Sequence, residues 1–391
     1  MATMGNPPAR TGHVGVMLSG RYLLIWGGYQ EDELFPERYL PSEEVWVFDV
    51  EIQKWFVTGT QGQVPPGTSG AVGLIHDHQL FIFGGHTEEG NTSEIYCLDL
   101  QTRQWRHLAV EERSEKPAPR DKHKGWVYDG KLYFYGGFGY PLHGYMNETR
   151  AHFFVDETSS GRGWNDQLFE FDIEEEKWNE CRCQGSVPSA RAAHAVAPMG
   201  DEVYLFGGRH QKTRLNDLYS YHMKQQIWKR LYPYGINPPG RSWHTLTPIS
   251  KSRIFLYGGY TQTGVPLSDA WVLDTALLEW TEVRVRDDEP RIWHTTCLAS
   301  TGDILIFGGC SNDILQQRAI HRNDILRIQC LPYSLYRLSL EAVFKYRDIL
   351  QSEWHILPQS IREVLEDKLE SLSNPRINQE RGIYGRSCVI L

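Results

Sequence analysis

The sequence has few cysteines, no long apolar run and no excess of basic residues. Its 391 residues include 7 cysteines, and their scattered, odd-numbered placement is typical of reduced thiols rather than of a disulfide framework. No apolar stretch approaches the roughly 18 residues that would predict a transmembrane helix. Residues 1–10 lack the basic and apolar segments of a secretory signal. We therefore expect a cytoplasmic or nuclear protein.

The usual sequence features of nucleic-acid binding, catalysis and metal binding are also missing. The formal net charge of −9 at pH 7 disfavours binding to nucleic acid, because phosphate contacts need a basic surface. There is no Gly-x-Ser-x-Gly, no His-Glu-x-x-His and no phosphate-binding glycine loop. Cys181 and Cys183 have no second cysteine pair nearby, so a zinc site is not expected. We expect a protein that is not an enzyme and uses no cofactor or metal.

What the chain does contain is one pattern that occurs six times. In each copy a short apolar and aromatic run, typical of a buried strand, ends at a Gly-Gly pair. The pairs lie at 27–28, 84–85, 136–137, 207–208, 258–259 and 308–309. An Arg-x-x-His motif precedes five of them, at residues 10/13, 120/123, 191/194, 241/244 and 291/294. A tryptophan follows five pairs, nine residues after an apolar residue, at positions 55, 105, 178, 228 and 280.

Each copy predicts four short strands in roughly 50 residues. One such sheet cannot bury both of its faces, whereas six sheets packed radially can. The spacing resembles the kelch repeat, and the resemblance covers roughly residues 10–330. We therefore expect an all-β fold, a six-bladed kelch β-propeller in residues 1–330, followed by a short C-terminal α-helical segment.

Three further expectations follow from the repeats. The sixth copy lacks a closing tryptophan, and we expect residues 1–9 to supply its fourth strand. Residues 29–44 and 138–166 follow Gly-Gly pairs and predict insertions between second and third strands. The five repeated histidines, one per blade, cannot converge on a single ion, so we expect them to be structural.

Antiparallel strands place the loop before the first strand and the loop after the second strand on the same end of the propeller, where binding usually resides. Arginine suits a carboxylate there, because its planar fork donates two parallel hydrogen bonds. Alternatively, Arg209 and Arg214 pair with acidic neighbours such as Asp217 or lie in solvent, and the aromatic residues of this face pack the blades. The residues placed on this face are Tyr29, His86, Lys122, Phe138, Trp164, Arg209, Arg214, Ser242, Trp243, Tyr260, Ile292, Trp293 and Cys310.

The pattern changes to a helical one after the repeats. Residues 334–352 and 358–372 predict two helices, and the second has an apolar stripe. We expect a helical segment over 331–372 and a flexible tail over 373–391. The helices either cap the propeller or dock a partner through exposed apolar faces.

Two motifs in this segment carry a second resemblance. Residues 334–343 look like the box that binds elongin C, with Leu335, Ser339 where cysteine is usual, and Val343. Residues 357–365 resemble the cullin-2 box. Its matching positions are Leu357, Pro358, Ile361 and Leu365.

In this order after a kelch propeller, the motifs resemble the kelch-repeat substrate receptors of cullin-2 RING ubiquitin ligases, along almost the full chain. The resemblance implies recognition of C-terminal degrons that end in Gly-Gly, and partnership with elongin B, elongin C and cullin-2 with its RING subunit. It implies that Arg209, Arg214 and Ser242 hold the terminal carboxylate. It also implies a surrounding pocket of Tyr29, Lys122, Phe138, Trp164 and Trp243, with Phe138 standing where the family has tyrosine.

The last four residues, Cys388 to Leu391, fit a C-a-a-X prenylation signal, with the final leucine favouring geranylgeranyl. The alternative is a chance tetrapeptide, and we expect membrane attachment only if Cys388 is prenylated.

Two other functions compete with the ligase receptor. One is a kelch scaffold for a cytoskeletal or signalling partner, with no ligase link. The other, a copper oxidase on a kelch propeller, is disfavoured because a secretory signal and a metal cluster are missing.

Overall fold

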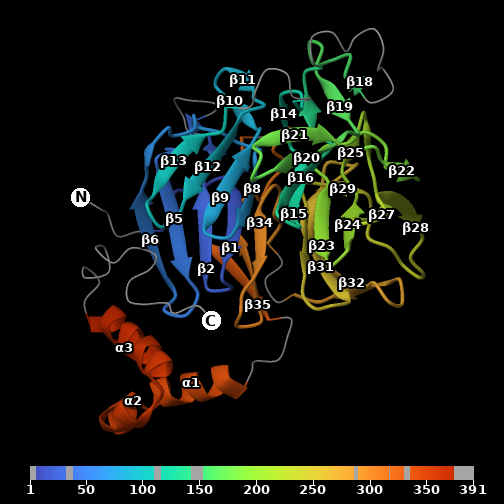
Figure 1. Cartoon of the computed structure of the whole chain (residues 1–391). Helices are drawn as coiled ribbons and strands as arrows, with labels where there is room; N and C mark the ends of the chain where they lie inside the picture. Colours follow the sequence, from blue (N-terminus) through green and yellow to red (C-terminus); the bar gives the residue numbers. More distant parts are fainter. Residues whose placement is uncertain are drawn as a thin grey trace.

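The computed structural model describes residues 6–31, 38–109, 116–141, 153–285, 289–316, 318–329 and 335–373. Its strands form sheets arranged around a central axis, with three helices at one end (Figure 1). This is the expected six-bladed propeller. Within the described ranges, no helix is long and apolar enough to cross a membrane.

Each blade begins with its innermost strand, and the first five blades have four antiparallel strands. Blade one contains β1 (Val14–Leu18), β2 (Tyr22–Trp26), β5 (Glu44–Asp49) and β6 (Lys54–Gly59). Blade two contains β8 (Val72–His76), β9 (Gln79–Phe83), β12 (Ile95–Asp99) and β13 (Gln104–His107). Blade three contains β15 (Lys124–Tyr128), β16 (Lys131–Tyr135), β20 (Leu168–Asp172) and β21 (Lys177–Glu180). Blade four contains β23 (Ala195–Met199), β24 (Glu202–Phe206), β27 (Leu218–His222) and β28 (Ile227–Leu231). Blade five contains β30 (Thr245–Pro248), β31 (Arg253–Thr261), β32 (Pro266–Asp274) and β33 (Glu279–Val283).

Shorter strands lie in the connections. Two of them extend blades two and four by parallel pairing, β7 (Gln61–Gly62) and β22 (Gln184–Gly185). The two expected insertions are confirmed, with β3 (Tyr29–Gln30) and β4 (Arg38–Tyr39) in the first, and β17 (Phe138–Gly139), β18 (Phe153–Val155) and β19 (Gly163–Asn165) in the second. The others are β10 (His86–Thr87), β11 (Gly90–Asn91), β14 (Arg120–Asp121), β25 (Arg209–His210), β26 (Thr213–Arg214) and β29 (Arg241–Ser242).

The sixth blade has three strands, β34 (Thr295–Leu298), β35 (Asp303–Phe307) and β36 (Ile325–Gln329). The expected fourth strand from the N-terminus is wrong for residues 6–9, which form no strand; residues 1–5 lie outside the described ranges. The N-terminal residues instead join the loop before β36. The Asn323 side chain donates to the Pro7 carbonyl at 3.2 Å, and the Arg10 amide donates to the Arg322 carbonyl at 3.1 Å.

A ring of backbone hydrogen bonds closes the propeller. Each blade contributes one residue to this ring, the one just before the repeated histidine position. All six ring residues adopt a left-handed conformation with φ between 54° and 67°. Each amide donates to the carbonyl of the ring residue in the preceding blade, and the blade-one amide donates to blade six. The donor–acceptor pairs are Gly70 to Gly12, Lys122 to Gly70, Ala193 to Lys122, Trp243 to Ala193, Trp293 to Trp243 and Gly12 to Trp293, at 2.7–3.2 Å.

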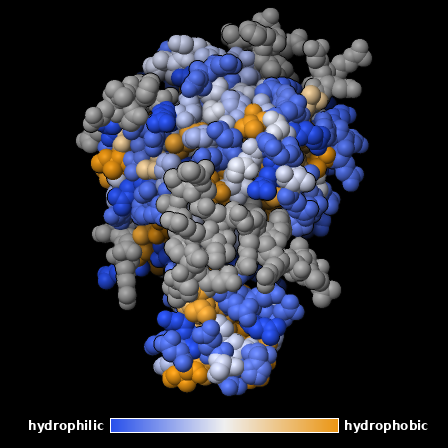
Figure 2. Space-filling view, turned by 90° about the vertical axis from the view of Figure 1, so that its left-hand side faces the viewer, coloured by the Kyte–Doolittle hydropathy of each residue, from blue (hydrophilic) through white to orange (hydrophobic). Residues whose placement is uncertain are grey.

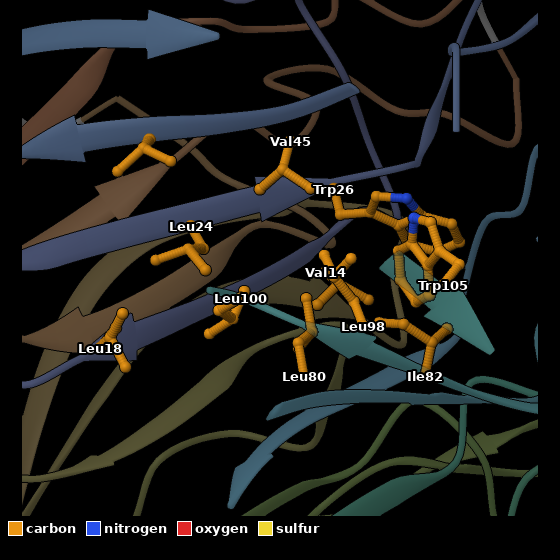
Figure 3. Packing of buried hydrophobic residues seen from close by; sticks show 11 residues of the cluster. Val14, Leu18, Leu24, Trp26, Val45, Leu80, Ile82, Leu98, Leu100 and Trp105 are labelled. Carbon is orange, nitrogen blue, oxygen red and sulfur yellow. The ribbon is translucent and has the colours of Figure 1, made fainter. Parts of the chain in front are cut away.

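Buried side chains fill the space between neighbouring blades. Between blades one and two, apolar side chains alternate along the strands and meet face to face (Figure 3). Trp26 and Trp105 lie there with ring centroids 5.7 Å apart. Burial of such rings supplies the main favourable free energy of the fold.

The repeated arginines stabilise their own blades internally. Arg191 forms two hydrogen bonds with Asp217, at 2.7 and 2.9 Å, and donates to the carbonyl of Gly207. Arg241 pairs in the same way with Asp269. Because a buried guanidinium needs such partners, these arginines belong to the fold rather than to a surface site.

The repeated histidines have a structural packing role, as expected. Each ring packs edge-on against the aromatic residue before the Gly-Gly pair of another blade, as His194 does against Tyr135 with centroids 5.7 Å apart. Within the described ranges, no three His, Cys, Asp or Glu side chains are placed to share a metal ion.

The helical unit comprises α1 (Leu335–Lys345), α2 (Arg347–Leu350), the 3₁₀ helix η1 (Gln351–Ile356) and α3 (Gln359–Ser373). The two expected helices are therefore present, with two short helical turns between them. The unit has its own small core, built on Leu340, Trp354 and Leu365. It contacts the propeller through charged side chains, because Arg337 donates to Glu51 at 2.5 Å in the turn between β5 and β6.

Candidate binding site

The central element of the site is the hairpin of β25 and β26, which follows the Gly-Gly pair of blade four. Its register places Arg209 directly opposite Arg214. Gly208 turns the chain into this hairpin with φ of 97°, and a Cβ there would lie 2.7 Å from the His194 side chain. Two guanidinium groups therefore extend from a short, rigid element.

Arg214 is only partly satisfied by the protein. Its Nε donates to Ser242 Oγ at 3.0 Å, and its guanidinium lies over the Tyr260 ring at 4.4 Å from the centroid. Its Nη2 is buried and has no hydrogen-bond partner within the described part of the chain. Burial, followed by the nearby charge of Arg209, lowers the pKa of Arg214. An anion that accepts from this nitrogen would offset both effects.

Within the described ranges the Arg209 side chain has one hydrogen bond, from Nε to the Gln211 carbonyl at 2.8 Å, and its guanidinium lies over Trp164 at 5.8 Å. In the described ranges neither Arg209 nor Arg214 forms an ion pair with an acidic side chain. The alternative pairing with Asp217 is wrong, because Asp217 is held by Arg191. The positive charge of the hairpin is thus available to a ligand.

Aromatic side chains connect the hairpin to the closing ring of the propeller. Trp243 lies 6.0 Å from Tyr260 and stacks on Trp293 at 5.7 Å, with 23° between the planes. Tyr29 packs against the far side of Trp293 at 5.9 Å. Lys122 places its ammonium 5.0 Å from the Trp293 ring and also bonds Asp121.

A second arm of the cluster comes from the blade-three insertion. Phe138 lies 5.1 Å from Trp164, the ring over which Arg209 is placed. Tyr29 and Trp164 are 7% and 4% exposed, so they support the cluster from below more than they line an open surface. The structure therefore connects all eight residues predicted from the sequence in one continuous cluster.

Tyr260 and Trp293 complete the cluster, although the sequence resemblance gave them no role. Tyr260 follows the Gly-Gly pair of blade five, and Trp293 occupies the same ring position as Trp243. The repeat pattern therefore predicts the position of both residues on this face. Tyr260 donates to Asp313 at 2.5 Å. Burial and this carboxylate raise the pKa of Tyr260 to about 12. The phenol therefore stays neutral beneath Arg214.

The residues predicted to dock partners lie at the opposite end of the molecule. Figure 1 shows β18, β19 and β25 at the end away from α1, α2 and α3. Leu335 is 83% exposed, Ser339 is exposed, and Val343 contacts the core of the helical unit. Apolar residues are visible on the surface of this unit, at the bottom of Figure 2.

The predicted cullin-box residues are placed differently. Leu365 is fully buried in the core of the helical unit, and Leu357 and Ile361 pack against it. Pro358 is exposed. Three of these four side chains thus hold the helices together. Cys388 and its possible prenylation lie outside the described residues.

Six radial blades, the closing ring and the repeated Arg-Asp pairs define a kelch-type propeller, and the chain belongs to the kelch-repeat family. The family described as "KLHDC2/KLHL20/DRC7 Kelch-repeats domain" matches residues 1–158 and 155–330. Kelch domain-containing protein 2 of Bos taurus is 39% identical over 381 residues, which cover 95% of this chain and 93% of that protein. Kelch domain-containing protein 1 of Mus musculus is 34% identical over 382 residues, or 96% and 93%. The solved "Structure of YjhT" aligns with a TM-score of 0.61 at 17% identity, covering 83% of this chain and 97% of that one, and supports the fold alone.

Proposed function

We propose that this protein is the substrate-recognition subunit of a cullin-2 RING ubiquitin ligase, and that it binds free C-termini ending in glycine. It would present the bound protein for ubiquitination without itself being an enzyme. The observation that carries the proposal is the buried, unpartnered Nη2 of Arg214 beside Arg209. Kinship with kelch domain-containing proteins 2 and 1 supports a receptor or interaction role.

The chemistry of the cluster favours a carboxylate over other ligands. Two half-buried guanidinium groups that form no ion pair with an acidic side chain in the described ranges favour an anion as ligand. The Ser242 hydroxyl lies at hydrogen-bond distance from Arg214 and is itself 1% exposed, so it orients the arginine. The neighbouring Trp243 and Trp293 offer rings for the residues that precede the carboxylate.

The distance between the two functional ends supports a bridging role. The proposed degron site and the helical unit lie at opposite ends of the propeller (Figure 1). A substrate held by Arg209 and Arg214 would thus leave the helical unit free for elongin C, elongin B and cullin-2 with its RING subunit. Leu335, which is 83% exposed, would be the main elongin contact.

Peptide titration tests the site directly. Fluorescence anisotropy would compare a peptide ending in Gly-Gly acid with its C-terminal amide. We expect the amide to bind more weakly by roughly 2–5 kcal/mol, because the buried guanidinium loses its charged acceptor. Arg214→Gln should abolish the difference, whereas Arg230→Gln, on the outer strand of the same blade, should retain it. Equal affinity for acid and amide in the unmodified protein would rule out the carboxylate site.

The second candidate is a kelch scaffold without a ligase link. The packing of Leu357, Ile361 and Leu365 into the helical core favours it, because these side chains serve folding first. Co-purification separates the two functions: a scaffold recovers no elongin B or elongin C. The same experiment on a cytoplasmic and a nuclear fraction tests the proposed cytoplasmic or nuclear location.

A further inference from the structure

A small, partly enclosed cavity lies on the propeller axis, on the inner side of the closing ring. Its volume is about 30 Å³, which is room for one or two water-sized guests. All six ring residues form part of its wall, namely Gly12, Gly70, Lys122, Ala193, Trp243 and Trp293. Its remaining polar lining comes from the innermost strands and the residues that precede them, namely His13, His123, Lys124, His194, His244, His294 and Thr295.

Lys124 is the unusual residue of this lining. It stands at the first position of β15, where the other blades carry Val14, Val72, Ala195, Thr245 and Thr295. Its half-buried side chain forms no hydrogen bond or ion pair within the described part of the chain. Burial alone lowers the pKa of its ammonium to about 8, so at neutral pH the amine is still mostly protonated.

The charge of Lys124 lies close to all of the repeated histidines. Burial, followed by the charge of the repeated arginine in the same blade, lowers the pKa of His13, His123, His194, His244 and His294, and Lys124 adds a smaller contribution to each. These imidazoles are consequently neutral, and each has one N–H group and one acceptor nitrogen. No aspartate or glutamate is among the residues that line the cavity. The cavity thus contains a cation with no protein counter-charge.

An uncompensated ammonium in such a space is unfavourable unless an anion neutralises it. Lys122, the other lysine of the lining, already bonds Asp121, so it does not need a second anion. The small space favours a monatomic ion over phosphate-sized and larger ones. Within the described ranges neither ring nitrogen of His194 has a hydrogen-bond partner, so its N–H group can donate to the guest.

We propose that the axial cavity is a halide site, in which Lys124 and the surrounding imidazoles hold one chloride ion. This site is separate from the arginine hairpin, and the inference does not rest on the proposed function. The bound ion would neutralise the Lys124 ammonium at the place where the closing ring brings the innermost strands of the blades together. Its loss should therefore loosen the propeller as a whole rather than one loop.

Anomalous diffraction from crystals grown in sodium bromide tests the proposal on the unmodified protein. We expect one bromide peak in the cavity, in contact with Lys124 Nζ. Lys124→Val should remove the peak, and valine fits this position because Val14 and Val72 occupy it in blades one and two. A cavity without an anomalous peak, or a peak that persists in Lys124→Val, overturns the proposal.

Thermal unfolding gives a second readout. At equal ionic strength, the unmodified protein should have a higher Tm in sodium chloride than in sodium gluconate, whose anion is too large for the cavity. Lys124→Val should lose this chloride-specific rise, while Lys224→Ala, which removes an exposed lysine, should keep it. An equal rise in the unmodified protein and in Lys124→Val also overturns the proposal.

Discussion

Arg337 of α1 donates to Glu51, in the blade-one turn, at 2.5 Å, and this contact fixes the helical unit to the propeller. Lys368 of α3 lies 3.9 Å from the same carboxylate. Arg337 and Lys368 are only 3% and 8% exposed, so Glu51 is a carboxylate shared by two buried cations, and Glu341 pairs with Arg337 as well at 2.8 Å. Arg21, in the turn between β1 and β2, extends the contact toward Asp367 at 4.0 Å.

Glu51→Gln should release the helical unit. Removing this charge leaves Arg337 and Lys368 without their shared partner, at a cost of about 2–5 kcal/mol to docking. Hydrogen exchange of the α1 and α3 amides should then become faster, with the blades unchanged. Glu353→Gln, an exposed position in η1, is the matched control. Unchanged exchange in Glu51→Gln would show that the docking has another basis.

The stability of the propeller should fall as the pH falls, because the buried histidines are neutral when folded. Burial holds the pKa of His294 at about 3 and that of His194 well below its usual value of 6.5. The unfolded chain therefore binds more protons than the folded chain below about pH 6.5. The stabilising effect is complete above that pH and is lost progressively toward about pH 3. Each histidine contributes up to about 1.4 kcal/mol per pH unit.

His194→Ala tests this pH dependence, and blade two already has Ala71 at the matching position. Urea unfolding between about pH 6.5 and 5.5 should show a slope smaller by about 1 kcal/mol per pH unit than in the unmodified protein, because the unfolded histidine is only partly protonated in this range. His222→Ala, at the end of β27 and outside the ring, should leave most of the slope. A slope that does not change in His194→Ala would mean that this imidazole is protonated in the fold.

Arg214→Lys should weaken peptide binding although it conserves the charge. Lysine cannot keep both the bond to Ser242 and a forked contact to a carboxylate, because it lacks the planar guanidinium. We expect a loss of about 1.5–3 kcal/mol, or roughly 10- to 100-fold in Kd. Isothermal titration with a Gly-Gly acid peptide measures it, with Arg230→Lys as control. Full affinity in Arg214→Lys would show that the site needs only a positive charge at this position and not the planar guanidinium.

Leu335→Ala should abolish co-purification with elongin B and elongin C. Leu335 is 83% exposed, so its truncation removes a contact surface without weakening the fold. The thermal unfolding midpoint should therefore stay within a degree or so, as for other exposed substitutions. Ile349→Ala, which is 75% exposed on α2, is the control. Recovery of the elongins with Leu335→Ala would show that the docking surface lies elsewhere.

The repeat predicted much of the fold, because each of its markers acts within one blade. Apolar runs that end in Gly-Gly became second strands, and residues 29–44 and 138–166 became insertions. The fourth strand of blade six was predicted wrongly for residues 6–9, because the local pattern does not say which distant segment reaches a blade edge. The Arg191–Asp217 pair was also missed, since one side chain of the pair is not part of the repeated motif.

The candidate site was predicted residue by residue, but its connections were not. Arg209 and Arg214 stand out in the sequence because they break the repeat. Only the hairpin register places them opposite each other, and only the fold buries the Nη2 of Arg214. In the helical unit the cullin-box pattern is visible in the sequence, whereas the burial of Leu365 depends on Leu340 and Trp354 from other helices.

By itself, the sequence determined six blades, their order, and the end of the propeller on which the arginines lie, because short-range patterns of apolar residues and glycines control strands and turns. The tertiary structure alone decided which charges are neutralised. Asp217 pairs with Arg191, and Glu51 pairs with Arg337. Among the described residues, Arg214 Nη2 and the Lys124 side chain have no hydrogen-bond partner. The strength of a charge interaction depends on burial and on distances of a few ångströms between residues far apart in the chain, and folding is what sets both.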